Sequence, residues 1–403
     1  MPKSNNTLMG VRKEVFILSF ANFFSDFGAG MTIALVPLYI RFLHGGIFDS
    51  IPLTVQAALA VSVFGIMMAL LQPFVGKWSD KTGKRKPFIL AGFLLFAITS
   101  LLYAYITSFS QMMILRMIHG MSVGMFIPAT MAIIAHHSTR ENRGRTMGMY
   151  STLRGAGFGL GPVVGGAIAT YHSFEAAFYI AAILGVISFI LVKLFVDEVG
   201  SEPHKNTHPT TENGRSDSGM RSILMLASAM LVMMMGIMMI VPLLPVYETR
   251  LNASEFMLGL TISAFMLSRL IFQIPFGILG DRIGKKKMIV VGMLVSIPIV
   301  LSMAYVTTIY QLIAIRLVQG ITTAAIDTPA MALVADLAGG HNVASKMSYI
   351  TMSFAGGMAI GPLMGGALAG YVSFESPFYL TGILTLVAAL VISRNVHEVH
   401  HGV

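Results

Sequence analysis

Two aspartates are the first candidates for chemistry, because each lies inside a long apolar run. Asp26 falls in the segment 22–28 and Asp327 in the segment 323–329. A charged side chain inside a bilayer is costly, so it usually faces a cavity or a partner. Removal from water also favours the protonated form of a carboxyl group. We therefore predict that Asp26 carries protons, with a buried structural pair as the alternative. Asp327 is the second candidate, and it could instead cap a helix broken at Pro329.

Two arginines also lie inside apolar runs. Arg154 could pair with Asp26 or bind an anionic substrate, and Arg269 is similarly placed and could do either. Because acidic and basic groups are both present, the sequence does not decide between a cationic and an anionic substrate.

The composition indicates that these charged residues lie in a membrane protein. Of the 403 residues, 55% are hydrophobic and 11% are charged, whereas about a quarter of an ordinary soluble domain is charged. Lipid is therefore the expected solvent for most of the surface. The net charge of +9 lies in short clusters between apolar runs, which argues against nucleic acid as a partner. The lack of cysteine excludes disulfides, thiolate metal sites and cysteine nucleophiles.

Twelve apolar runs have the roughly 20 residues that a helix needs to cross a bilayer. They are too long for the strands of a membrane barrel and do not alternate as such strands do. The sequence therefore predicts an all-α membrane protein with the spans Glu14–Phe42, Pro52–Val75, Pro87–Thr107, Gln111–Ala135, Thr146–Tyr171, Glu175–Val196, Arg221–Tyr247, Glu255–Phe276, Lys287–Val306, Gln311–Leu337, Ser348–Tyr371 and Ser376–Ile392.

Lysine and arginine gather in alternate loops, at 77–86, 140–145 and 282–287. Cationic flanks stay in the cytoplasm, so we predict a multi-pass protein of the plasma (inner) membrane with both termini cytoplasmic. The short loops and tails indicate a prokaryotic protein. The segment 197–220 is rich in Ser, Thr, Asn, Pro and His and is predicted to be a cytoplasmic linker.

The two halves of the chain, 1–196 and 221–403, repeat one another at a shift of 200 residues. Matching positions include Arg116 with Arg316, Gly120 with Gly320, and the run 173–175 with 373–375. An even number of spans in each half gives both halves the same orientation. We therefore predict two parallel six-helix bundles around a central cavity, which would alternate between two states by rocking.

One basic loop occurs in both halves, with glycines and an aspartate in register. Its residues are Gly76, Asp80, Gly83 and Arg85 in the first half and Gly277, Asp281 and Gly284 in the second. We expect the glycines to form a tight turn and the aspartate to meet a helix N-terminus or an arginine. The alternative is a short basic loop that only obeys the charge rule.

These loops resemble the signature loop of the major facilitator superfamily, Gly-x-x-x-Asp-x-x-Gly followed by Arg or Lys. The resemblance covers nearly the whole chain and implies a transporter with 12 spans, whose two loops take part in conformational gating. It also implies a protein that works as a monomer in a lipid bilayer on a small-molecule substrate, without a cofactor.

The predicted fifth span contains a glycine pattern that is similar to one associated with drug and metabolite antiporters. It comprises Gly157, Gly161, Pro162, Gly165 and Gly166. The resemblance implies a gating role and export coupled to protons. A similar pattern recurs in span eleven, with Gly361 and Pro362, which favours the alternative of a close-packing seam.

The fourth span carries Arg116, His119 and Gly120, which resemble the family's Arg-x-x-Gln-Gly element. The resemblance implies that Arg116 biases the protonation of nearby acidic groups. The alternative is that Arg116 reaches the outer membrane surface with its long side chain. His119 departs from the usual glutamine, and it could be a titrating relay or a hydrogen-bonded structural group.

The remaining candidates would line a substrate cavity. Phe23, Phe27 and Met31 lie on faces of span one that adjoin Asp26, and Tyr150 and Phe354 begin the equivalent stretches of spans five and eleven. The 31 methionines and 26 phenylalanines suit a pliable cavity for hydrophobic molecules.

An enzyme is not predicted, because the chain has no Walker loop and no metal-spaced His and Glu pair. The favoured function is proton-coupled export of small hydrophobic or amphipathic molecules, as in a multidrug antiporter. The alternative is proton- or sodium-coupled uptake or flipping of a sugar, an organic anion or a lipid. A receptor or scaffold would not need duplicated gating loops.

Overall fold

A computed structural model describes residues 7–8, 11–44, 48, 50–138, 142–198, 217–338 and 343–396. The chain separates into two compact units, residues 1–46 with 63–209, and residues 47–62 with 210–403. The described residues form twelve long helical segments, which confirms the predicted number of spans. The predicted linker 197–220 lies mostly outside the described residues. The cavity predicted between the halves stays a prediction.

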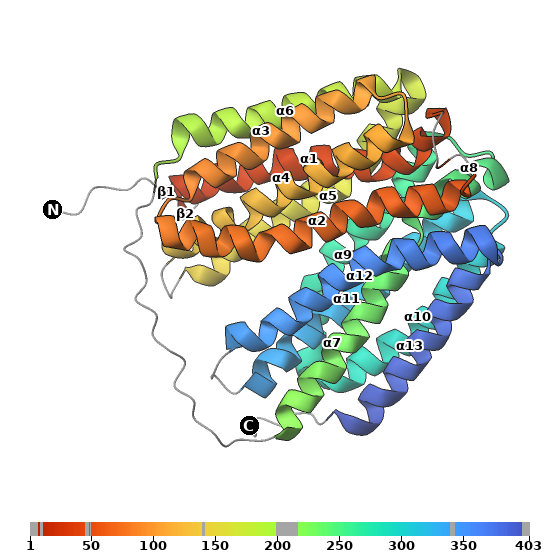
Figure 1. The fold of residues 1–403 in the computed structure, drawn as a ribbon. Coiled ribbons are helices and arrows are strands. Elements are labelled where there is room, and N and C mark those ends of the chain that lie inside the picture. Colours follow the sequence, from red (N-terminus) through yellow and green to blue (C-terminus); the bar gives the residue numbers. More distant parts are fainter. Residues whose placement is uncertain are drawn as a thin grey trace. The chain divides into compact units, whose positions relative to one another are not determined.

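The first half of the chain contains a small hairpin and six long helices (Figure 1). Their bounds are β1 (Thr7–Leu8), β2 (Val11–Arg12), α1 (Lys13–Tyr39), the 3₁₀ turn η1 (Ile40–Phe42), α2 (Leu53–Thr82), α3 (Lys86–Leu102), η2 (Tyr103–Tyr105), α4 (Phe109–His136), α5 (Arg143–Tyr171) and α6 (Phe174–Phe195).

The second half contains seven helices, two of which make up one span. Their bounds are α7 (Asp217–Met238), η3 (Val241–Leu243), α8 (Leu244–Leu251), α9 (Glu255–Ile283), α10 (Lys285–Ser302), η4 (Met303–Tyr305), α11 (Ile309–Ala338), α12 (Val343–Tyr371) and α13 (Ser376–Asn395). The predicted span Arg221–Tyr247 is therefore not one helix. Pro242 and Pro245 each stand in a first turn, of η3 and α8, where a missing backbone N–H is tolerated.

Eleven helical segments of the described part are long and apolar enough to cross a membrane. The 29-residue helix α5 is not among them, because its glycines and arginines dilute its apolar residues. Several helices begin with a side-chain cap. Ser108 and Gln111 form a capping box at the start of α4, and Thr308 and Gln311 make the corresponding contacts at α11. The repeat thus extends to helix ends.

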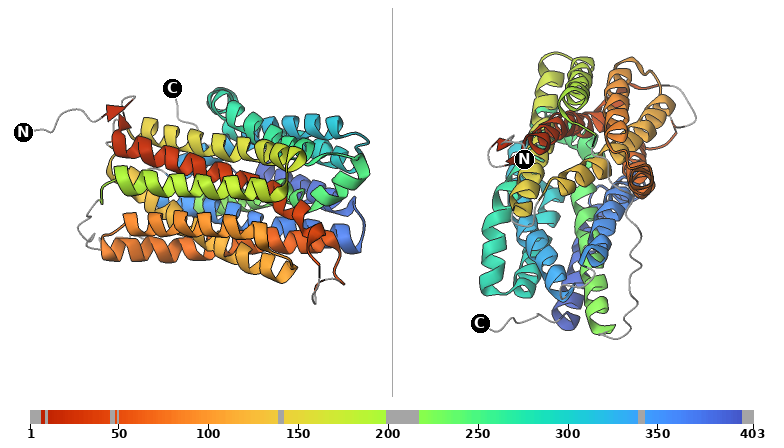
Figure 2. Two further views of the ribbon diagram at one scale, coloured as in Figure 1. Left: turned by 90° about the horizontal axis from the view of Figure 1, so that it is seen from above. Right: turned by 90° about the vertical axis from the view of Figure 1, so that its left-hand side faces the viewer.

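Corresponding helices pack together in the two units. In unit 1, α1 packs on α5 and α6, and α3 packs on α4 and α6; in unit 2, α7 packs on α12 and α13, and α10 packs on α11 and α13. The views of Figures 1 and 2 show α3 beside α6 and α10 beside α13. The start of α2 groups with unit 2, where Thr54 Oγ1 donates to the carbonyl oxygen of Gly366 at 3.0 Å.

The β1–β2 hairpin was not predicted from the sequence. Its two strands are antiparallel, with Thr7 opposite Arg12, and Val11 joins the core of unit 1. Arg12 Nη1 lies 2.9 Å from His137 Nδ1, just beyond the end of α4. Burial lowers the pKa of His137; Arg12 and His136 act in the same direction, and Glu14 opposes them. Because a guanidinium can only donate, His137 Nδ1 must be the acceptor in this contact.

Candidate functional site

Glycines bring α1 and α5 close enough for Asp26 and Arg154 to meet. A Cβ on Gly157 would lie 2.5 Å from the carbonyl oxygen of Phe23, and one on Gly165 would lie 2.8 Å from Met31 Cβ. Gly161 has even less room, against the carbonyl oxygen of Phe27. Only residues without a side chain allow this approach. The glycine pattern is therefore a packing seam; any gating role for it stays a prediction.

The Asp26–Arg154 pair is buried and bidentate. Arg154 Nε donates to Asp26 Oδ2 at 2.6 Å, and Nη2 donates to Oδ1 at 3.1 Å. The side chain of Asp26 is 3% exposed and that of Arg154 is 29% exposed. Two parallel N–H···O bonds give both strength and a fixed orientation. Of the two roles predicted for Arg154, the structure shows the pair with Asp26.

Four phenylalanines run along α1, and the last two of them lie within one turn of Asp26. Phe16, Phe20, Phe23 and Phe27 follow one another with ring centroids 4.7, 6.4 and 6.0 Å apart, and all four are half-buried. Phe23 and Phe27 were predicted from the sequence, whereas Phe16 and Phe20 were not. The spacing of four, three and four residues, which places side chains on one helix face, was the signal for them.

Two residues predicted to line a cavity are buried instead. Met31 is 0% exposed and Tyr150 is 2% exposed. Met31 packs into the α1–α5 seam, and the Tyr150 ring lies 5.6 Å from the Arg154 guanidinium carbon. Phe354, the repeat partner of Arg154, is half-buried against a cluster of α7 and α9 that includes Met234 and Met238.

A second ion pair lies in unit 2, between α9 and α11. Arg269 Nη2 is 2.6 Å from Asp327 Oδ2, and the Asp327 side chain is 3% exposed. The helix α11 continues through Pro329, so the alternative of a cap on a broken helix is wrong. The pair is not the repeat equivalent of the first one, because Ile127 occupies the position that matches Asp327.

Arg116 and His119 form a buried aromatic cluster in unit 1. Arg116 is 1% exposed, and its guanidinium carbon is 4.6 Å from the Phe64 ring centroid. The alternative that Arg116 reaches the outer surface is therefore wrong. The His119 ring lies among Phe64, Phe96 and Tyr103, and its Nδ1 is 3.3 Å from the Tyr103 hydroxyl. This surrounding favours a packed structural histidine; the relay role stays a prediction.

In the second half of the chain, Gln319 occupies the position that matches His119. Arg316 Nη1 donates to Gln319 Oε1 at 2.6 Å, and its guanidinium carbon is 4.4 Å from the Phe265 ring. Each unit thus holds a deeply buried arginine against one aromatic ring, an arrangement that stabilises a desolvated guanidinium.

The signature segments are mostly helical, which corrects the expected turn. Gly76, Asp80, Gly277 and Asp281 lie within α2 and α9, and only Gly83 and Gly284 form turns, with φ of 65° and 101°. Asp80 Oδ1 lies 3.6 Å from Arg85 Nη2, and an arginine was one of the two partners predicted for this aspartate. Asp281 Oδ1 lies 3.2 Å from Lys285 Nζ.

The N-terminus of α3 is met by a residue that the sequence analysis missed. Glu198 Oε1 accepts the backbone N–H of Arg85 at 2.7 Å and that of Lys86 at 3.3 Å. A carboxylate at a helix N-terminus is stabilised by the helix dipole. No local spacing in the sequence indicates this contact, because Glu198 lies after α6, at the start of the predicted linker and 113 residues from Arg85.

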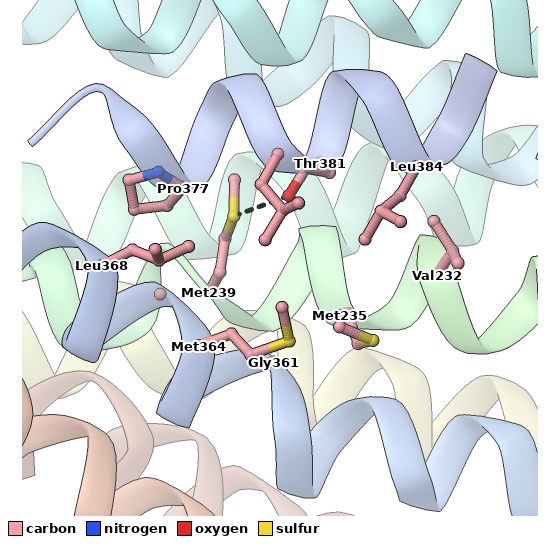
Figure 3. Close-up of a pocket in the computed structure, with 11 residues that line it drawn as sticks. Val232, Met235, Met239, Gly361, Met364, Leu368, Pro377, Thr381 and Leu384 are labelled. Atoms are coloured by element: carbon pink, nitrogen blue, oxygen red, sulfur yellow. Dashed lines mark hydrogen bonds between the residues drawn. The ribbon is translucent and has the colours of Figure 1, made fainter. Parts of the chain in front are cut away.

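A cavity within unit 2 lies between α7, α12 and α13 (Figure 3). Its lining is mostly apolar and includes three methionines and three leucines. Thr381 Oγ1 donates to Met239 Sδ at 3.0 Å. Its lining is Val232, Met235, Met239, Gly361, Met364, Gly365, Leu368, Pro377, Leu380, Thr381 and Leu384. None of the predicted cavity residues belongs to this set. Gly361 was predicted for gating, and it lies against the Met235 backbone of α7.

Comparison with known proteins identifies the class of protein that this fold and these buried charges define. The family model for the Major Facilitator Superfamily matches residues 18–224 and 226–401. The chain belongs to this superfamily, whose members are membrane transporters. No metal-binding group of three or more His, Cys, Asp or Glu side chains occurs in the part of the chain that the structure describes.

Similar proteins narrow the class. The multidrug resistance protein MdtG of Salmonella arizonae is 30% identical, covering 90% of this chain and 91% of its own. MdtG of Proteus mirabilis is 29% identical, covering 92% of each chain, and the multidrug resistance efflux pump PmrA of Streptococcus pneumoniae is 28% identical, covering 92% of this chain and 93% of its own. In fold, the chain is similar to the crystal structure of a bacterial homologue of the human lysosomal transporter Spinster, with a TM-score of 0.76 and 14% sequence identity. The match covers 94% of this chain and 96% of that one.

Proposed function

We propose that this protein exports small hydrophobic or amphipathic organic molecules in exchange for protons, by alternating access. The buried bidentate pair of Asp26 and Arg154 is the observation that carries the proposal. The relatives named as multidrug resistance and efflux proteins support the direction of transport and the breadth of substrates.

Protonation is the event that can open this pair. A proton on Asp26 removes the negative charge that holds Arg154, and the site then changes from neutral to a net charge of +1. Arg154 is 29% exposed, so its guanidinium can turn toward an acceptor on a substrate or toward water. When Asp26 releases the proton, the two hydrogen bonds form again. Proton and substrate thereby act on the same side chain.

The phenylalanines of α1 provide an apolar surface next to the pair. Half-buried rings can pack against flat or flexible apolar molecules without demanding one shape. This surface supports a broad range of hydrophobic substrates and sets no requirement for a sugar-like pattern of hydroxyl groups.

The test measures proton movement in proteoliposomes that contain a pH-sensitive dye. Tetraphenylphosphonium and ethidium are the probes, because both are lipophilic cations. We expect each transported probe to drive protons in the opposite direction in the wild type. Asp26→Asn should abolish this flux. The matched control is Asp197→Asn, which removes an exposed carboxylate and should leave the flux unchanged.

Two results would contradict the proposal. Probe transport that proceeds equally well without a proton gradient would exclude coupling to protons. Transport that instead requires a sodium gradient would favour the sodium-coupled alternative. Equal flux in Asp26→Asn and wild type would remove Asp26 from the coupling step.

A further inference from the structure

The two buried ion pairs differ in geometry. Arg154 donates one hydrogen bond to each oxygen of Asp26, so that carboxylate is fully occupied. Arg269 Nη2 lies 2.6 Å from Asp327 Oδ2, whereas Asp327 Oδ1 has no hydrogen-bond partner within the described residues. Asp327 Oδ1 can therefore accept another partner while Oδ2 stays paired with Arg269.

Two more polar atoms beside Asp327 lack a partner among the described residues. They are Thr323 Oγ1 and Arg269 Nε. Thr323 precedes Asp327 by one turn of α11, so both side chains lie on the same helix face. Thr323 is 0% exposed and Asp327 is 2% exposed. A buried polar atom without a partner destabilises the fold, so such a cluster suits a partner that binds during part of the transport cycle.

A proton is the partner that suits this cluster. It converts the carboxylate into a donor, and the hydroxyl of Thr323 is an acceptor one turn away. A metal cation would lie beside the Arg269 guanidinium, whose positive charge opposes it.

The charges around Asp327 are few. Arg269 of α9 is the charged group that acts on it. On the neighbouring helices α7, α10 and α12, the described charged side chains Arg221, Lys285, Lys286, Lys287 and Lys346 all lie near helix ends. Arg316 and Asp336 lie on α11 itself, roughly two turns or more away. Arg269 is therefore the nearest charge to Asp327 among the described residues.

We propose that Asp327 binds a proton independently of Asp26, so that each unit holds one proton site and up to two protons are exchanged for each substrate molecule. Asp327 takes the proton from water on one side of the membrane, which changes the charge of its pair from zero to +1, and returns it to water on the other side. The number of protons exchanged for each substrate rests on the proposed function, whereas proton binding at Asp327 does not.

Infrared difference spectroscopy of the protein in lipid vesicles tests proton binding without any substrate. The pH is varied between about 5.5 and 9, above the range in which exposed carboxyl groups titrate. We expect the carbonyl stretch of two protonated carboxyl groups in the wild type. Asp327→Asn should remove about half of this signal, Asp26→Asn the other half, and Asp197→Asn none. An unchanged signal in Asp327→Asn overturns the proposal, because Asp327 would then be a permanently ionised member of its pair.

Asp327→Asn removes the ion-pair partner of Arg269, so a second variant separates loss of the proton site from loss of the fold. Asp327→Asn with Arg269→Gln removes both charges together, and it should lose the same half of the signal.

Proton release on binding tetraphenylphosphonium, which has no proton of its own, gives the number of protons exchanged for each bound substrate molecule. We expect a twofold decrease in Asp327→Asn; an unchanged number contradicts the two-proton exchange. Binding of the probe without any proton release in the wild type refutes the proposed antiport, while the infrared result still decides the site at Asp327.

Discussion

At the scale of single residues, the contact between Asp26 and Arg154 can be tested through stability. Arg154→Gln leaves a 3% exposed carboxylate without its cation, and breaking a buried pair in this way costs about 3–5 kcal/mol. We expect a clear fall in the midpoint of thermal unfolding in detergent. Asp26→Asn with Arg154→Gln removes both charges and should be closer to wild type. An equal loss in the single and double variants would show that the pair does not stabilise the fold.

A second prediction at this scale concerns pH. Because the folded pKa of His137 is lowered below its unfolded value, the docked N-terminal hairpin should be most stable above about pH 6.5. Its stability should decrease as the pH falls below that value, where the unfolded or undocked form binds more protons. Protonation also places a positive ring beside Arg12.

Hydrogen exchange of residues 11–13, corrected for the intrinsic pH dependence of exchange, measures this effect. Protection should decrease on acidification in the wild type. His137→Gln keeps an acceptor for Arg12 but does not titrate, so its protection should not change with pH. The same decrease in both proteins would show that another group controls docking.

Some residues of the candidate site were predictable and others were not. Asp26, Arg154, Asp327 and Arg269 were found because charges are rare inside apolar runs. Their pairing was only one alternative, since helix contacts cannot be read from one apolar run. Tyr150 and Met31 are buried here, and their place in a substrate cavity stays a prediction, because position along a helix does not tell which neighbouring helix covers a side chain.

At the scale of helices, the close approach of α1 and α5 depends on glycine. Gly157→Ala places a Cβ only 2.5 Å from the carbonyl oxygen of Phe23. Overpacking of this kind costs about 1–3 kcal/mol. Gly148 on the same helix has nothing within 4 Å of its Cβ position. Gly148→Ala is therefore the matched control, and it should be neutral or stabilising by up to about 1 kcal/mol. Thermal unfolding compares the two; equal midpoints would exclude a tight seam.

Helix number followed directly from the length of the apolar runs, whereas helix ends did not. The signature segments were expected to be loops because they are basic, but α2 and α9 extend through them. Lysine and arginine have good helix propensity, so charge alone does not end a helix. The two glycines at positive φ mark the real ends, because other residues rarely adopt that conformation. The apolar run continues between α7 and α8, and the helix is interrupted there at Pro242 and Pro245.

At the scale of the whole molecule, the predicted topology can be tested because the chain has no cysteine. Single cysteines at two exposed positions, Lys81→Cys and Ser110→Cys, provide the sites. In intact cells, a membrane-impermeant maleimide should label the cysteine at 110 and not the one at 81. Permeabilised cells should show labelling of both. The reverse pattern would place the termini outside the cytoplasm.

The superfamily was recognisable from the sequence because its signal is distributed over the whole chain, in the repeat, the loops and the span count. The two halves nevertheless differ where the chemistry lies. Phe354 and Ile127 occupy the positions that match Arg154 and Asp327, so the repeat predicts the scaffold and not the charges. Substrate identity depends on side chains that the repeat does not fix.

The glycine seam has one more consequence, for distance measurements. Where Gly157 and Gly161 meet α1, the nearest atoms are backbone oxygens of α1, with no layer of side chains that could change rotamer. Helices α1 and α5 should therefore keep a constant separation throughout the transport cycle. A pair of spin labels, one on each of these helices, gives an internal ruler. Distances that change between other helices can be judged against it, and the labelled protein reports its own experimental error.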